Sequence, residues 1–194
     1  MKTLAFDFGA SSGRAILSKF DGDKISLHEI HRFSNDPVMF TGTLYWDVLR
    51  LMNEMKTALI CCKQEGHGDL KSVASDTWGV DFGLLDKNGS LISNPVHYRD
   101  TRTDGMQEEA AKIIPDRAFY ESTGIQFMKL NTVYQLMSMG RTQPELLELA
   151  DKLLFMPDLF NYYLTGEKLC EYSIASTSQM MDARKKDRDR ALLQ

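Results

Sequence analysis

Apolar and polar side chains alternate at the start of the chain, which is the pattern of half-buried β-strands. A first run spans residues 4–8, and a second, at 14–20, ends at the turn-forming pair Asp21-Gly22. A third run at 24–30 loses its alternation after Leu27, which predicts a β-bulge or a position at the sheet edge. The sequence therefore predicts a meander of three strands.

Beyond residue 46 the apolar spacing changes to that of a helix. Asp47 is the expected N-cap, and Gly66 marks a point before which the helix should end. A fourth strand is expected at 72–78, and a hairpin at 82–92 around Asn88-Gly89. The apolar face of the expected helix consists of Val48, Leu51, Met52, Met55 and Leu59.

From Asp100 onward, helical signals dominate. Met106, Ala110 and Ile113 have helical spacing and are expected to share one buried face. The chain shows no repeat, linker or internal boundary, so residues 1–194 are expected to form one domain. The residues expected to begin or end further helices are Asn131 (N-cap), Pro144 and Pro157 (first turns) and Gly166 (C-terminal end).

Composition narrows the classes of partner. The 194 residues are 43% hydrophobic and 26% charged, with a net charge of −4, which gives no electrostatic footprint for nucleic acid or an anionic membrane. The basic cluster at 184–190 is diluted by aspartates and is expected to form a solvated helix face. No apolar run is long enough to span a membrane, and three cysteines make neither a disulfide framework nor a metal knuckle. The expected compartment is the cytoplasm.

The stretch Asp7-Phe8-Gly9-Ala10-Ser11-Ser12-Gly13-Arg14 carries the strongest chemical signal. A tight strand–turn–strand rich in Gly and Ser presents backbone N–H groups and hydroxyls in one concavity, which suits a phosphate. Mg²⁺ prefers oxygen ligands, and Asp7 at the strand end supplies a carboxylate for it. The leading interpretation is a nucleotide phosphate site.

Three alternatives exist for this stretch. Residues 9–13 also fit the G-x-S-x-G hydrolase pattern, with Ser11 as nucleophile, although that motif requires a strand-to-helix elbow. Asp7-Phe8-Gly9 is a protein-kinase triplet, but a kinase needs a whole lobe upstream of it. The third alternative is a plain hairpin turn. The histidines available to serve as base for a Ser11 nucleophile are His28, His31, His67 and His97.

Three strands, a helix and a returning strand resemble the ribonuclease-H-like α/β core shared by actin, sugar kinases and Hsp70. Five motifs in collinear order resemble the FGGY carbohydrate kinases over essentially the whole chain. Residues 127–134 depart from the common FGGY pattern in the manner of the rhamnulokinase branch. The motifs are residues 7–14, Asp76-Thr77-Trp78-Gly79-Val80-Asp81-Phe82, Tyr98-Arg99-Asp100-Thr101-Arg102, Gly124-Ile125-Gln126-Phe127 and Met156-Pro157-Asp158.

The resemblance implies roles for individual residues in ATP-dependent phosphorylation of a ketose, with L-rhamnulose converted to L-rhamnulose 1-phosphate. Asp7 would position Mg²⁺ and the transferring phosphate. Gly79 would approach the ketose closely, with Trp78 and Asp81 shaping its pocket, since Gly permits close backbone approach and Trp offers a flat apolar face. The residues implied to contact the terminal phosphates of ATP are Ala10, Ser11, Ser12, Gly13 and Arg14.

In this family the catalytic base and the adenosine pocket lie beyond residue 194. The chain is therefore expected to be the N-terminal, sugar-binding side of a kinase, incomplete at its C-terminal end and inactive alone, because phosphoryl transfer needs both walls of a cleft. Uncovered sheet surface would favour self-association. The alternative hypothesis is a non-catalytic actin-like or Hsp70-like ATPase module, and Trp78-Gly79-Val80-Asp81 is the feature that discriminates between the two.

Overall fold

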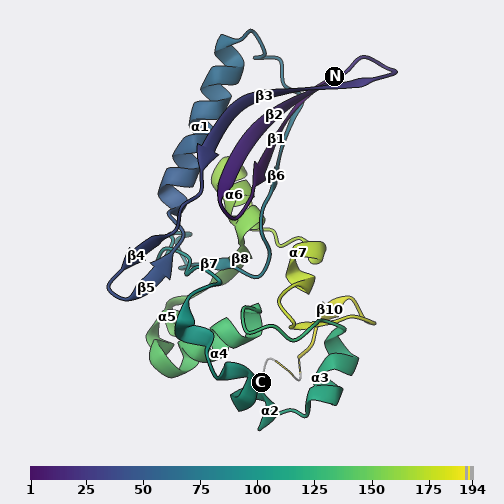
Figure 1. Cartoon of the computed structure of the whole chain (residues 1–194). Coiled ribbons are helices and arrows are strands. Elements are labelled where there is room, and N and C mark those ends of the chain that lie inside the picture. Colours follow the sequence, from purple (N-terminus) through teal and green to yellow (C-terminus); the bar gives the residue numbers. More distant parts are fainter. Residues whose placement is uncertain (191, 193–194) are drawn as a thin grey trace.

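A computed structural model describes residues 1–190 and 192. A sheet lies above a group of mostly short helices, with α1 and α6 beside the sheet (Figure 1). The strands are β1 (Lys2–Phe8), β2 (Ser12–Phe20), β3 (Ile25–Ser34), β4 (Val38–Phe40), β5 (Thr43–Tyr45), β6 (Ser72–Asp76), β7 (Phe82–Leu85), β8 (Lys152–Phe155), β9 (Met181–Asp182) and β10 (Asp187–Arg188). The helices are α1 (Val48–Gln64), α2 (Met106–Ala111), α3 (Asp116–Thr123), α4 (Thr132–Thr142), α5 (Pro144–Leu149), α6 (Met156–Thr165), α7 (Tyr172–Ser176) and the 3₁₀ helix η1 (Thr101–Thr103).

The main sheet has the strand order β3-β2-β1-β6, with the first three strands antiparallel and β6 parallel to β1. This confirms the expected meander and returning strand. β3 lies at the edge, and its register against β2 shifts so that Ala15 pairs with His31 but Ile16 pairs with Glu29. Ile30 is therefore the extra residue of a bulge, and both features predicted for this strand are confirmed.

One core joins the sheet to α1 and α6. The apolar residues of β1 at positions 4, 6 and 8 all point into it, because alternate side chains of a strand share a face. Phe8 stacks on Phe160 of α6 with ring centroids 4.6 Å apart. Asp47 caps α1 as expected, its carboxylate accepting a hydrogen bond of 3.1 Å from the Arg50 backbone N–H. The helix thereby presents its apolar face to the sheet.

One strand prediction needs correction, and a second is confirmed in part. β6 ends at Asp76, two residues earlier than expected, so Trp78 lies in a loop. The expected hairpin around Asn88-Gly89 does form in short form: Leu85 bridges Leu91 antiparallel, the Ile92 N–H donates to the Leu84 carbonyl and the Asp86 N–H donates to the Ser90 carbonyl. In addition β7, whose four residues are all buried, pairs along its full length with β8, a partner that the sequence did not predict.

Two helix predictions also need correction. Ile113 lies beyond the end of α2 and is 70% exposed, so it is not part of a buried face. The basic cluster at 184–190 is not helical, because β9 and β10 form a short antiparallel hairpin there. The Asp182 carboxylate accepts from the backbone N–H groups of Arg184 and Lys185, which stabilises a turn in place of a helix.

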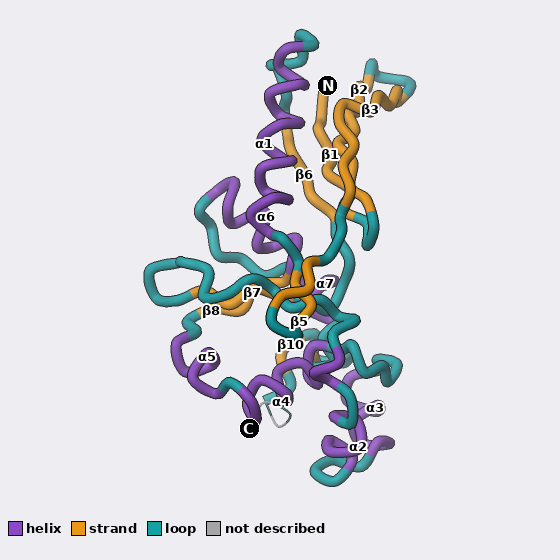
Figure 2. The backbone as a smooth tube through the Cα atoms, turned by 60° about the vertical axis from the view of Figure 1, so that its left-hand side comes forward, coloured by secondary structure: helices purple, strands orange, loops and turns teal. Residues whose placement is uncertain are grey.

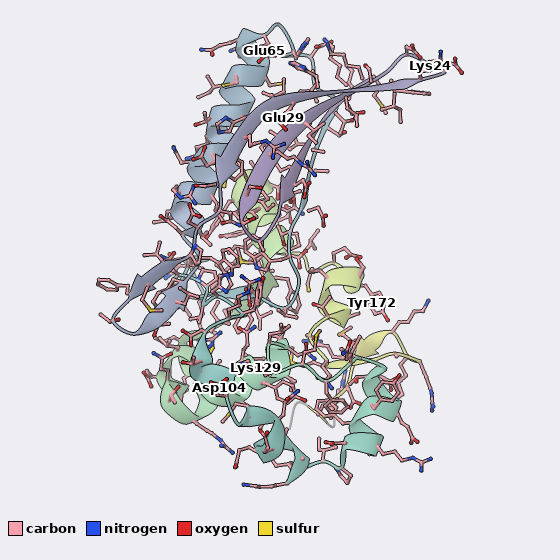
Figure 3. All side chains as sticks on the ribbon, in the orientation of Figure 1. Lys24, Glu29, Glu65, Asp104, Lys129 and Tyr172 are labelled. Atoms are coloured by element: carbon pink, nitrogen blue, oxygen red, sulfur yellow. The ribbon has the colours of Figure 1, made fainter. Side chains whose placement is uncertain are left out.

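The lower part of the molecule consists of helices and loops from the second half of the chain (Figure 2). Figure 3 places Lys24 at the far tip of the β2–β3 hairpin and Tyr172 about midway down the molecule, between the sheet and the lower helices. Asn131 and Pro144 begin α4 and α5, and Gly166 ends α6 in a left-handed conformation, all as predicted. In the described part of the chain, every helix is too short or too polar to cross a bilayer.

Candidate functional site

The site begins where two parallel strands end side by side. Asp7 of β1 is paired in register with Asp76 of β6, and Asp7 is also the cross-strand partner of Arg14. The Arg14 guanidinium donates to the Asp7 Oδ2 atom from Nε at 2.8 Å and from Nη2 at 2.7 Å. The side chains of both partners are more than 40% exposed, so the carboxylate remains accessible to solvent. Asp76 was not anticipated beside Asp7; their positions at two adjacent strand ends were the available signal.

The turn that follows β1 is held from below by a buried side chain. The Asn35 amide donates 2.7 Å to the Gly9 carbonyl, and its backbone N–H donates 2.9 Å to the Ser11 carbonyl. Asn35 is 1% exposed and was missed in the sequence, where it appears only as a loop residue. The backbone N–H groups of Ala10 and Ser11 donate to no other group in the described residues. The turn therefore offers two free donors to a ligand.

Gly13 has a structural reason to be glycine. A Cβ atom at this position would lie 2.3 Å from the ring of Phe33, which is nearly buried on β3. We expect Gly13→Ala to lower the free energy of unfolding by about 2 kcal/mol, because the added methyl overpacks the core. Urea denaturation measures the loss, with Ser12→Ala on the exposed neighbour as control. Equal stability of the two variants would contradict this packing account.

The loop after β6 forms one wall of a hollow of about 560 Å³. Trp78 and Gly79, the residues predicted to face a sugar, line this hollow, and its opposite wall comes from the loop before α4, which the sequence did not assign to a pocket. An ion pair of 2.7 Å between Lys129 and Asp104 fastens that loop (Figure 3). The lining residues are Trp78, Gly79, Val80, Tyr98, Ile125, Gln126, Met128, Leu130, Asn131 and Thr177. Aromatic and apolar walls with a few polar groups are typical of small-molecule sites.

Val80 in this wall has a strained backbone. Its φ of 67° lies in the left-handed region, which a β-branched residue rarely adopts. Two threonine hydroxyls hold it: Thr132 Oγ1 donates 2.6 Å to the Val80 carbonyl, and Thr177 Oγ1 accepts 3.1 Å from its N–H. Strain of this kind costs of order 1–3 kcal/mol and clusters at ligand sites. The strained backbone makes the hollow a candidate functional site.

Asp81 does not line the hollow, which corrects the expectation that it would accept hydrogen bonds from a ligand. It is fully buried beneath the wall. Its Oδ2 atom accepts from the indole N–H groups of Trp46 at 2.6 Å and Trp78 at 3.0 Å. Burial raises the pKa of Asp81 to about 6, against the opposing effect of these hydrogen bonds. Its carboxylate is already saturated with protein donors.

Gly79 was expected to be a glycine so that the backbone could approach a sugar closely, but the structure shows a contact with protein at this position. A Cβ atom there would lie 3.2–3.4 Å from the side chain of Thr177, not in open space inside the hollow. Thr177 lines the hollow too and holds the Val80 N–H. Gly79 therefore keeps two walls of the hollow in close contact.

His97 is a second buried titratable group in this region, stacked on Trp46 with ring centroids 4.0 Å apart. Burial, assisted by the charge of Arg99, lowers the pKa of His97 to about 4. Its contribution to stability is therefore complete above its ordinary pKa of 6.5 and lost as the pH falls through 4. The raised pKa of Asp81 acts oppositely: its contribution is complete below its ordinary value of 3.8 and lost as the pH rises through about 6.

Removing Asp81 and comparing the variant with the unsubstituted chain isolates the contribution of Asp81, because that of His97 is common to both proteins. The shift of Asp81 corresponds to about 3 kcal/mol. We expect the free energy of unfolding of Asp81→Asn, relative to the unsubstituted chain, to rise by roughly this amount between pH 4 and pH 7. Denaturant titrations followed by far-UV circular dichroism at several pH values measure the difference. A difference that stays constant with pH would contradict the assigned pKa.

The hydrolase alternative for Ser11 is wrong. The G-x-S-x-G pattern requires a helix after the serine, and strand β2 follows instead. Two of the histidines are engaged elsewhere, since His31 of β3 bonds Glu54 of α1 and His28 bonds Glu65, which follows the last residue of α1. The turn instead fits a Mg²⁺-bound phosphate, because it combines free N–H donors with the accessible carboxylate of Asp7.

Comparison with known proteins decides the family. The model of the FGGY family of carbohydrate kinases, N-terminal domain, matches residues 2–194. The chain belongs to the FGGY family of carbohydrate kinases. It is 42% identical over 180 residues to a rhamnulokinase of Oceanobacillus iheyensis and 41% identical over 192 residues to one of Halalkalibacterium halodurans. These alignments cover 93% and 99% of this chain but 38% and 41% of the relatives.

Solved structures confirm the fold expected of an FGGY kinase. A xylulose kinase from Lactobacillus acidophilus superposes with a TM-score of 0.87 at 14% identity, covering 99% of this chain and 39% of that one. A glycerol kinase from Plasmodium falciparum with ADP gives 0.80 at 15% identity, covering 98% and 40%. The FGGY membership decides against the alternative that the chain is a module of the actin or Hsp70 families.

Proposed function

We propose that residues 1–194 form the N-terminal, sugar-binding side of an ATP-dependent kinase that phosphorylates a ketose, L-rhamnulose, to its 1-phosphate. One observation carries the proposal. The turn with free N–H groups follows the end of β1, and the loop that lines the hollow follows the end of β6. These two strand ends lie side by side, because Asp7 and Asp76 are paired in register. Ligands of open α/β sheets bind outside such strand ends. The choice of L-rhamnulose rests on the two rhamnulokinase relatives.

In the proposed reaction the phosphate bound at the turn after β1 is transferred to a sugar bound in the hollow. A sugar hydroxyl oxygen forms a bond to the γ-phosphorus of ATP as the bond from that phosphorus to the bridging oxygen of ADP breaks. Asp7 would hold Mg²⁺, which neutralises phosphate charge, and the free N–H groups of Ala10 and Ser11 would bind phosphate oxygens. Ser12, Gly13 and Arg14 complete this phosphate side.

Trp78, Gly79 and Tyr98 would orient the sugar in the hollow. The proton acceptor for its hydroxyl and the adenosine pocket are proposed to lie outside these residues, so we expect no ATP-dependent sugar phosphorylation by the 194-residue chain alone.

Sugar binding by the chain tests the proposal. The protein has two tryptophans, and one of them, Trp78, lines the hollow. Titration with L-rhamnulose should produce a saturable change in their emission, and the aldose L-rhamnose should produce a weaker one. The absence of any saturable change with L-rhamnulose, in a chain shown by circular dichroism to be folded, would contradict the proposal.

We also propose that the isolated chain self-associates through the edge strand β3. Ile25 and Leu27 on this strand are 66% and 69% exposed, and unpaired edges favour pairing between chains. Sedimentation velocity should show association that increases with concentration and that Leu27→Lys reduces. Leu49→Lys, at a similarly exposed position on α1, is the control. Monomers at every concentration would contradict this proposal.

A further inference from the structure

Beneath the hollow, three buried or partly buried polar side chains from separate segments form a directed chain of hydrogen bonds. Arg102 Nη2 donates 2.6 Å to Gln135 Oε1, and Gln135 Nε2 donates 2.9 Å to Asp81 Oδ1. Arg102 comes from η1, Gln135 from α4, and Asp81 directly precedes β7. The direction of each bond is fixed, because a guanidinium only donates and a carboxylate only accepts.

The other end of this chain holds the aromatic wall. Asp81 Oδ2 accepts from the Trp78 indole N–H at 3.0 Å and from the Tyr98 backbone N–H at 3.1 Å. Both residues line the hollow. Oδ2 also accepts from Trp46, which stacks on Trp78 with ring centroids 3.8 Å apart. A single oxygen atom therefore fixes two aromatic walls of the hollow and the ring behind one of them.

We infer that Asp81 is a positioning residue for the sugar: its carboxylate, held in place by Gln135 and Arg102, sets the placement of Trp78 and Tyr98 against the ligand. This inference rests on the proposed function for the assignment of the hollow to a sugar. Asp81 would then not contact the sugar itself; it would affect sugar binding by holding Trp78 and Tyr98 in place. The Arg102–Gln135–Asp81 chain accordingly contributes to sugar recognition without touching the sugar.

The arrangement requires a carboxylate and not its amide. Oδ2 faces three donors and Oδ1 faces the amide N–H of Gln135, so an asparagine at position 81 must turn its NH₂ group toward at least one donor. Gln135 cannot rotate its amide to compensate, because its oxygen would then leave Arg102 without an acceptor. Leaving a buried donor unsatisfied costs the desolvation of that group, so the wall should shift.

The test compares Asp81→Asn with Asp158→Asn in the full chain, by L-rhamnulose titration and by the indole N–H resonances of the two tryptophans. Asp158 is a matched control, because it is also a buried aspartate but accepts from the Glu171 N–H away from the hollow. We expect Asp81→Asn to weaken sugar binding about tenfold and to move the Trp46 and Trp78 indole resonances. Asp158→Asn should leave both measurements unchanged, whatever its effect on stability.

The outcomes separate this inference from the proposed function. If the unsubstituted chain binds L-rhamnulose and Asp81→Asn binds it equally well, the inference is overturned and the proposed function stands. If the unsubstituted chain binds no sugar, the proposed function fails, and unmoved indole resonances in Asp81→Asn would overturn the positioning as well. Should Asp81→Asn not fold, Trp78→Phe keeps an aromatic wall but removes one N–H held by Asp81. Unchanged sugar affinity in that variant would also overturn the inference.

Discussion

Replacing Gly79 by valine is expected to abolish binding of L-rhamnulose by the chain. A Cβ atom at this position already approaches Thr177 to 3.2–3.4 Å, and the two further methyl groups of valine cannot be placed without moving that wall. Thr177 would then release the Val80 N–H, which holds the strained backbone of the hollow. Tryptophan emission during sugar titration measures the loss.

Two control variants show whether the crowding of Thr177 is the cause. Gly68→Val places a Cβ 3.7 Å from the Lys63 side chain, an ordinary contact, and should leave sugar binding intact. Adding Thr177→Ser to Gly79→Val removes the crowded methyl group but keeps the hydroxyl that accepts from the Val80 N–H, and should restore part of the binding. Full sugar affinity in Gly79→Val would show that the pocket has been misplaced.

Replacing Asp7 by asparagine is expected to lower phosphoryl transfer by a hundredfold or more. The measurement uses a hybrid enzyme in which this chain replaces the aligned part of the Halalkalibacterium rhamnulokinase, so that the remaining 59% of that relative is present. The reason is electrostatic: in the proposed role the Asp7 carboxylate would position the charge that neutralises the transferring phosphate, and removal of one group that stabilises transition-state charge typically costs about 10²–10³ in turnover.

A surface aspartate provides the comparison for Asp7. Asp69 forms an exposed ion pair of 2.6 Å with Lys2, so Asp69→Asn should leave turnover nearly unchanged. Circular dichroism of the hybrid variants establishes that each is folded. Turnover of Asp7→Asn within twofold of the unsubstituted hybrid, at saturating Mg-ATP, would remove Asp7 from its proposed role.

Local patterns predicted the part of the fold that local forces determine. Alternation located β1, β2 and β3, and the slip after Leu27 located the bulge, because a strand buried on one face must keep its period. Asp47 located the start of α1, since a cap acts on its own first turn. The phosphate-type turn was visible for the same reason: its Gly and Ser residues are contiguous.

Features that depend on distant segments could not be predicted in this way. β8 pairs with β7 across some seventy residues, and no pattern within either strand indicates which strand it will pair with. The short β4–β5 hairpin has too few residues for a period to appear. The far wall of the hollow comes from the loop before α4, and the burial of Asp81 depends on Trp46 and Gln135 arriving from other elements. Tertiary packing therefore decided which motif residues line the hollow and which are buried behind it.

The measurement that tests the central claim most directly is sugar phosphorylation by the hybrid enzyme. Trp78, Gly79 and Tyr98, which line the hollow and are proposed to bind the sugar, come from this chain, so the substrate preference of the hybrid reports on the hollow. The kcat/KM for L-rhamnulose should exceed those for D-xylulose and glycerol by at least about tenfold, and the separate 194-residue chain should transfer no phosphate. A folded hybrid that prefers either of the other substrates, or a separate chain that phosphorylates L-rhamnulose, would contradict the account.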